Sequence, residues 1–168
     1  MNAQSEQAVF QSTARVFRTA YYVAKHNKPF TDFESLIDLQ EGNSQDMGRV
    51  LHRKPVAVDI IDHVSSQMKT KLLTKIIESR SKINGLADES SRLGQKSTLI
   101  IFLKTNVDGE AAPVSFPLDL VDLETLCASY IKDAILFCLR KNRFTTELLQ
   151  EVFIGFCGDA ASVMLGTK

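Results

Sequence analysis

The sequence predicts an α+β fold, in which an N-terminal helical region precedes a mixed sheet built in the order β-β-β-α-β. Up to residue 82, apolar residues recur every three to four positions, which is the period of amphipathic helices. From residue 83 on, short runs of β-branched and large apolar residues alternate with turn sequences, as is typical of strands. A helical segment then precedes a fourth run, and a helix between strands of one sheet usually joins parallel neighbours.

Composition limits the class of protein. The 168 residues, with 44% apolar and 24% charged side chains, are close to globular averages, so we expect a folded chain. Twenty Lys and Arg balance twenty Asp and Glu, which removes any global attraction to nucleic acid or anionic lipid. No stretch of eighteen apolar residues occurs, and the N-terminus does not resemble a secretion signal, so we expect no membrane partner. We divide the chain into a helical region, 1–82, and a sheet domain, 83–168.

Three helices are expected in the first region. Thr31 followed by Glu34 has the spacing of a capping box, and Pro55 suits the first turn of a helix. The first helix carries a stripe of Phe10, Phe17 and Tyr21 at helical spacing. The predicted helices are residues 5–25, 31–42 and 56–81.

Three antiparallel strands follow, then a helix and a last strand. The Asp108-Gly109 pair between the second and third runs is a hairpin signal. Pro117 predicts that the third strand is irregular or at an edge, because proline cannot donate to a sheet ladder. The predicted strands are 83–90, 97–107, 114–123 and a buried strand over 152–157, with a helix within 124–144 and the start of another at 160–165.

Two aspartates stand at the ends of predicted strands. Asp88 ends the first strand and Asp159 ends the fourth, and parallel pairing of these strands would bring the two carboxylates together. Close carboxylates favour a hard divalent cation, so Mg²⁺ or Mn²⁺ is the expected ligand and phosphodiester chemistry the expected reaction. Simpler explanations remain open: Asp159 suits a helix N-cap, and Asp88 suits a polar turn leaving a strand.

Neither the cysteines nor the cationic residues form a recognisable site. Cys127, Cys138 and Cys157 stand among apolar neighbours without metal-binding spacing, so we expect buried, reduced thiols in a cytosolic or nuclear chain. The basic run 69–82 is the nearest approach to a nucleic-acid patch. A solvated helix face explains this run better.

Two stretches resemble the hAT transposase superfamily, especially its domesticated vertebrate members. These are "GLADESSRLGQKSTLIIFLK" and, about seventy residues after Asp88, "IGFCGDAASVMLG". The resemblance implies a partial ribonuclease H-like core and maps the first two acids of a D-D-E triad onto Asp88 and Asp159. Ala160 stands where many members have glycine. The third acid of the family would follow Lys168, after a helical insertion, so we expect about half of such a domain here.

From this resemblance we expect a domesticated, transposase-derived nuclear protein that acts through DNA or protein interaction without transposase activity. The expected partners are nuclear proteins and, in a longer protein, DNA. One alternative is a metal-dependent DDE-type strand-transfer enzyme using Asp88 and Asp159; another is a SUMO-pathway ligase-type factor. A homodimer through the stripe of Phe10, Phe17 and Tyr21 is a further hypothesis.

Overall fold

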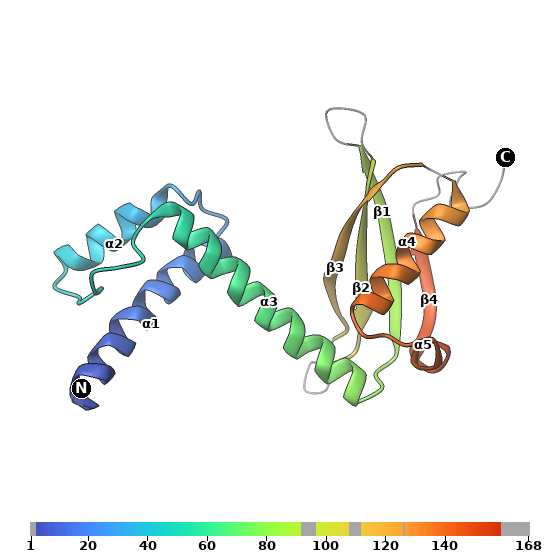
Figure 1. Cartoon of the computed structure of the whole chain (residues 1–168), viewed down its shortest axis with the longest axis horizontal. Helices are drawn as coiled ribbons and strands as arrows, with labels where there is room; N and C mark the ends of the chain where they lie inside the picture. The colour runs from blue at the N-terminus through green and yellow to red at the C-terminus, as the bar shows by residue number, and fades with distance from the viewer. Residues whose placement is uncertain (1–2, 92–96, 108–111, 126, 159–168) are drawn as a thin grey trace. The chain divides into compact units, whose positions relative to one another are not determined.

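The computed structural model describes residues 3–91, 97–107, 112–125 and 127–158 (Figure 1). The chain forms two compact units, Met1–Thr70 and Lys71–Lys168, whose border lies within one helix. The elements in chain order are α1 (Ala3–Lys25), α2 (Asp32–Gly42), α3 (Lys54–Glu78), β1 (Ile83–Ser91), β2 (Ser97–Thr105), β3 (Val114–Leu123), α4 (Ala128–Lys141), α5 (Thr146–Val152) and β4 (Phe153–Gly158). The α+β class is confirmed.

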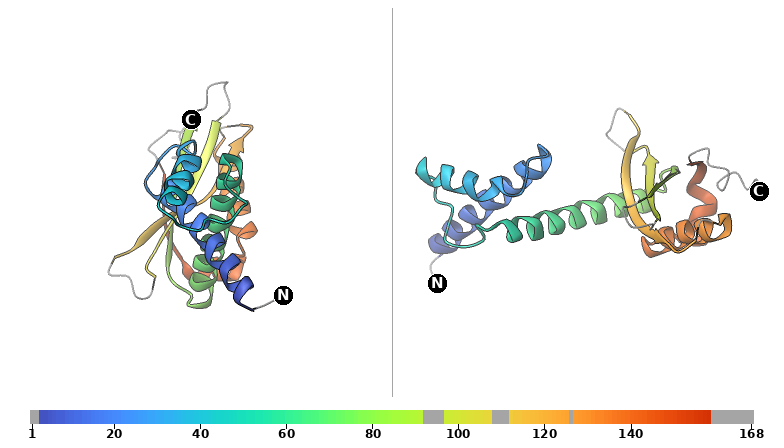
Figure 2. Two further views of the ribbon diagram at one scale, coloured as in Figure 1. Left: turned by 90° about the vertical axis from the view of Figure 1, so that its left-hand side faces the viewer. Right: turned by 90° about the horizontal axis from the view of Figure 1, so that it is seen from above.

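The first unit is built from α1, α2 and the beginning of α3, as the apolar spacing predicts. Helix α2 lies beside α1 (Figure 2) and contributes the fully buried Phe33 and Ile37. The face of α1 toward this core carries Val16, Ala20 and Val23. Ala20 suits a close helix contact because its side chain is small.

The large side chains of α1 lie mostly outside this core. Phe17 packs against the core, but Phe10 is 68% and Tyr21 43% exposed. The 3.6-residue period predicts an amphipathic helix correctly. The large aromatic side chains, however, do not mark the face of the helix that is buried. Two of the three residues of the aromatic stripe, Phe10 and Tyr21, therefore lie outside the packed surface.

Helix α2 starts where predicted but not through the predicted capping box. Thr31 occupies the N-cap position with helical dihedrals (φ −63°, ψ −26°), and its side chain makes no capping hydrogen bond. The backbone N–H groups of Asp32 and Phe33 donate to the preceding turn instead. The Glu34 carboxylate accepts a 2.9 Å hydrogen bond from the backbone N–H of Lys54, so it links α2 to the start of α3.

The second unit contains the mixed four-stranded sheet, in the order β3-β2-β1-β4. The β1–β2 and β2–β3 pairs are antiparallel and the β1–β4 pair is parallel, as predicted. Strand β3 is an edge strand, and its register shifts opposite Ile101 and Phe102, beside Pro117. The prediction for Pro117 is confirmed, because an edge strand tolerates a residue that cannot donate.

One face of the sheet carries α4 and the main core of this unit (Figure 1). Alternate residues of β1 and β2 point into it, including Ile83, Ala87, Leu99 and Ile101. Lys141 near the end of α4 donates a 2.9 Å hydrogen bond to Asp119 on β3, which attaches the helix to that edge. The remaining core residues come from α3, β2, β3, α4, α5 and the α4–α5 connection: Leu73, Ile76, Leu103, Leu118, Leu123, Ile131, Ala134, Cys138, Leu139, Phe144 and Val152.

Helix α5 was not predicted, and β4 is not the buried strand that was expected. Strand β4 lies at the sheet edge, with Ile154 61% and Phe156 47% exposed. A short apolar run has the same composition in a central strand and at an edge, so its burial depends on the sheet order. Within the described residues, we find no helix with the length and hydropathy needed to cross a bilayer.

Candidate apolar cleft and acidic site

Asp88 lies inside β1 and not at its end, so the position predicted for this acid is wrong, although the predicted strand 83–90 agrees with β1 to within one residue. It pairs with Ile100 of β2, and the ladder continues through the Glu89–Leu99, Ser90–Thr98 and Ser91–Ser97 pairs. The polar sequence after Asp88 suggested a turn, but pairing with β2 extends the strand. The Asp88 side chain is exposed, and strand alternation directs it away from the face that buries Ala87.

Of the two acids that were predicted to lie close together, the structure describes only Asp88. Parallel pairing places Ala87 of β1 opposite Gly158 of β4, and these residues immediately precede Asp88 and Asp159. Asp159 itself and the predicted helix at 160–165 lie outside the described residues. Among the residues that the structure describes, no three His, Cys, Asp or Glu side chains are grouped so that they could hold a metal ion.

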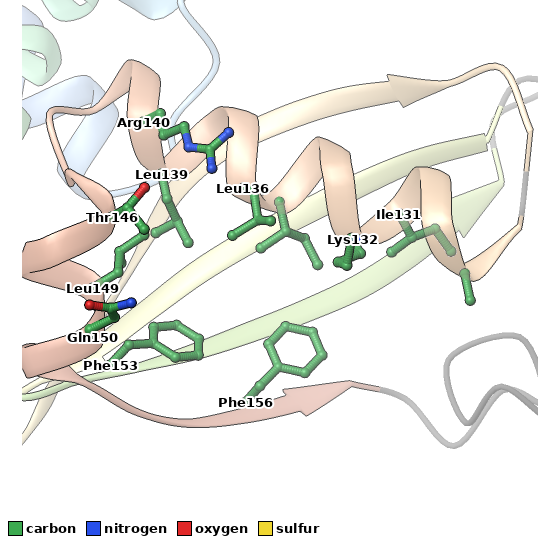
Figure 3. A pocket seen from close by; sticks show the side chains of 12 residues that line it. Ile131, Lys132, Leu136, Leu139, Arg140, Thr146, Leu149, Gln150, Phe153 and Phe156 are labelled. Atoms are coloured by element: carbon green, nitrogen blue, oxygen red, sulfur yellow. The ribbon is translucent and has the colours of Figure 1, made fainter.

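An apolar cleft of about 530 Å³ lies between α4, α5 and β4 and is here called the α4–β4 cleft (Figure 3). Ile131, Leu136 and Leu139 line it from α4, and Leu149 lines it from α5. The rings of Phe153 and Phe156 on β4 extend toward α4 from the opposite side. A cleft with this lining suits an apolar group rather than a phosphate.

Gly85 of β1 makes room for the floor of this cleft. A Cβ atom at Gly85 would lie 3.1 Å from the Phe153 ring and 3.2 Å from the Phe156 ring. The missing side chain therefore lets both rings lie against β1. Sequence analysis missed this role because the register of β1 with β4 is a tertiary property.

Two cations stand among the cleft residues. Lys132 and Arg140 both line it, and the remaining polar lining residues are Thr146 and Gln150, so the described lining contains no carboxylate. Lys132 forms a 3.4 Å ion pair with Asp133, and the two side chains are 67% and 70% exposed. Such an exposed pair is weak and leaves the ammonium accessible to another anion.

Helix α5 is held in place by its cap and by the basic run. The Thr145 hydroxyl accepts a 3.2 Å hydrogen bond from the Leu148 N–H, a signal in the sequence that could have located this helix. Glu151 forms an ion pair with Arg80, and its backbone carbonyl accepts a 2.7 Å hydrogen bond from Lys82. Part of the 69–82 run therefore attaches α5 to the residues before β1.

The expectation of three buried thiols is wrong for two of them. Cys138 is buried in the core, whereas Cys127 and Cys157 are exposed. Cys127 occupies the N-cap position of α4, where a hydrogen bond with Ser129 is the main cause that lowers the pKa of its thiol. Apolar neighbours in sequence do not bury a residue that stands at a helix start or on an edge strand.

Comparison with protein-family models finds none that matches this chain, and comparison with curated proteins finds no matching sequence.

Proposed function

We propose that this chain is a domesticated, hAT transposase-derived nuclear protein that works through protein interaction, with the second unit as its interaction module. Its support is the sequence resemblance together with the three antiparallel strands, the helical connection from β3 to β4 and the parallel β1–β4 pair, which suit a partial ribonuclease H-like core. Transposase activity is not part of the proposal.

The α4–β4 cleft is the observation that carries the interaction function. Its apolar lining is open to solvent, and Phe156 is 47% exposed within it. Exposed apolar surfaces of this kind are typical of protein-binding sites. The cleft favours a protein over DNA, because nucleic-acid surfaces need several cations along a phosphate path.

Site-specific photocrosslinking in nuclei tests this proposal. A benzophenone amino acid at position 136 would face the cleft, whereas the same group at position 133 serves as a control on the exposed side of α4. We expect a defined protein adduct from position 136 and a different, weaker pattern from position 133. Identical patterns, or a chain excluded from nuclei, would reject the proposal.

A metal-dependent strand-transfer enzyme is the second candidate, favoured by the Ala87–Gly158 pair that precedes Asp88 and Asp159. Its test is titration calorimetry with Mg²⁺ and Mn²⁺. If the acids act together, Asp88→Asn and Asp159→Asn each abolish the binding heat, while Asp38→Asn on the exposed face of α2 does not. Absence of heat in the parent chain removes this candidate.

A further inference from the structure

We infer that the α4–β4 cleft binds an amphipathic helix of a partner protein, whose apolar stripe enters the cleft and whose acidic flank faces Lys132 and Arg140. This inference rests on the proposed interaction function and adds the chemistry of the partner. Three features of the second unit carry it: the width of the sheet, the lining of the cleft, and the position of its cations.

The sheet is wider than the helix that covers it. Four strands about 4.8 Å apart span roughly 15–19 Å, whereas one helix covers about 10 Å. Lys141 attaches α4 to Asp119 on β3, at the far edge from β4. The α4–β4 cleft is therefore a space beside α4 and over β4, where a second helix would pack 8–10 Å from the first, as helices commonly do.

The lining of the cleft suits the apolar stripe of a helix. Leu136 and Leu139 form one wall, Leu149 closes one end, and the rings of Phe153 and Phe156 form the floor (Figure 3). Aliphatic side chains at positions i, i+3, i+4 and i+7 would fill such a groove. A strand added to the free edge of β4 would bond to its backbone and leave the groove on the helix-bearing face empty.

The two cations define the charge pattern of the partner. Lys132 and Arg140 are eight residues apart on α4, which corresponds to about 12 Å along the helix axis. Two carboxylates seven or eight residues apart on a neighbouring helix have the same spacing. The described lining contains no acid to repel them.

A peptide titration tests the inference with the full chain. The probe is a fluorescein-labelled helical peptide with a Leu stripe and two Glu residues seven positions apart, and its matched control carries Lys in place of Glu. By fluorescence anisotropy we expect the Glu peptide to bind about tenfold more tightly at low salt, because two ion pairs contribute. This difference should shrink at high salt, where the charges are screened.

A charge reversal assigns the binding to this cleft. Lys132→Glu combined with Arg140→Glu should invert the preference, so that the Lys peptide binds more tightly. The control, Lys104→Glu combined with Arg49→Glu, changes the net charge equally at exposed residues outside the cleft lining and should leave the preference unchanged. Circular dichroism verifies that each variant is folded.

Other outcomes would overturn the inference, and some of them would show that a different segment or molecule occupies the α4–β4 cleft. Equal affinity for both peptides would show that the partner helix does not need acidic residues facing Lys132 and Arg140. Tighter binding after Met164→Asp with Leu165→Asp would assign the cleft to the chain's own residues, and a dimer that the peptide dissociates would assign it to a second copy. If neither peptide binds but position 136 still crosslinks to a nuclear protein, the inference of a helical partner is wrong, whereas the proposed interaction function is supported.

Discussion

The ring of Phe153 on β4 lies against Gly85 on β1, so close that a Cβ atom there would come within 3.1 Å of it. The parallel pairing of these strands produces this contact, and the same contact shapes the floor of the α4–β4 cleft. One residue without a side chain thus connects the packing of the sheet with the site proposed to bind a partner.

Substitution of Gly85 should therefore affect both stability and the cleft. Gly85→Val forces the rings of Phe153 and Phe156 to move, and overpacking of this kind lowers the free energy of unfolding by about 1–3 kcal/mol. Urea unfolding measures the loss. Gly42→Val is the control, because a Cβ atom at Gly42 meets nothing within 4 Å. Equal effects of both substitutions would show that the ring contact is unimportant.

The Lys141–Asp119 pair should attach α4 to β3 in a pH-dependent manner. The hydrogen bond with Asp119 raises the pKa of Lys141 above its ordinary 10.5. The stabilisation is therefore fully present below pH 10.5 and is lost as the pH rises through the folded pKa. Lys141→Met should lower the free energy of unfolding at pH 7 by at most about 1 kcal/mol, since the lysine is exposed.

Urea unfolding at several pH values measures this effect, with Lys104→Met as the control on the exposed surface of β2. The difference between parent and Lys141→Met should narrow in strongly alkaline solution. A difference that grows there would contradict the assigned ion pair.

Cys127 should react faster with alkylating reagents than an ordinary exposed thiol. Ser129 is the main cause that lowers the pKa of Cys127 below 9.0, so more thiolate is present at neutral pH. In a Cys157→Ser background, iodoacetamide should modify Cys127 while the buried Cys138 stays protected. Ser129→Ala should slow the reaction about twofold or more, and Ser129→Thr should restore it. Unchanged rates would exclude the hydroxyl as the cause.

The two phenylalanines of α1 should respond differently to a charge. Phe17 is partly buried against the core of the first unit, so Phe17→Asp should cost about 1–3 kcal/mol through loss of apolar contact. Phe10 is 68% exposed, and Phe10→Asp should leave the midpoint of thermal unfolding nearly unchanged. Equal destabilisation by both changes would contradict the described face of α1.

Light scattering on the same Phe10→Asp variant tests the homodimer hypothesis without unfolding the chain. A parent dimer that becomes a folded monomer supports an interface on α1. A monomeric parent removes this hypothesis.

Local patterns were sufficient to predict most elements of this protein. Helical spacing located α1, α2 and α3, and β-branched runs located the strands, because both signals depend on residues close in sequence. The parallel β1–β4 pair also followed from sequence, since the helix between β3 and β4 favours a crossover. Helix α5 was missed because it is short and its apolar residues merge with those of β4.

Features that depend on the neighbours of an element were decided only by the tertiary structure. Pairing with β2 extends β1 beyond Asp88, and the edge position of β4 exposes Phe156. Cys127 and Cys138 have similar apolar surroundings in sequence, yet one is exposed and the other buried. Sequence alone determined which segments form helices and strands; the packing of those segments decided which of their faces remain open, because burial depends on contacts between residues far apart in the chain.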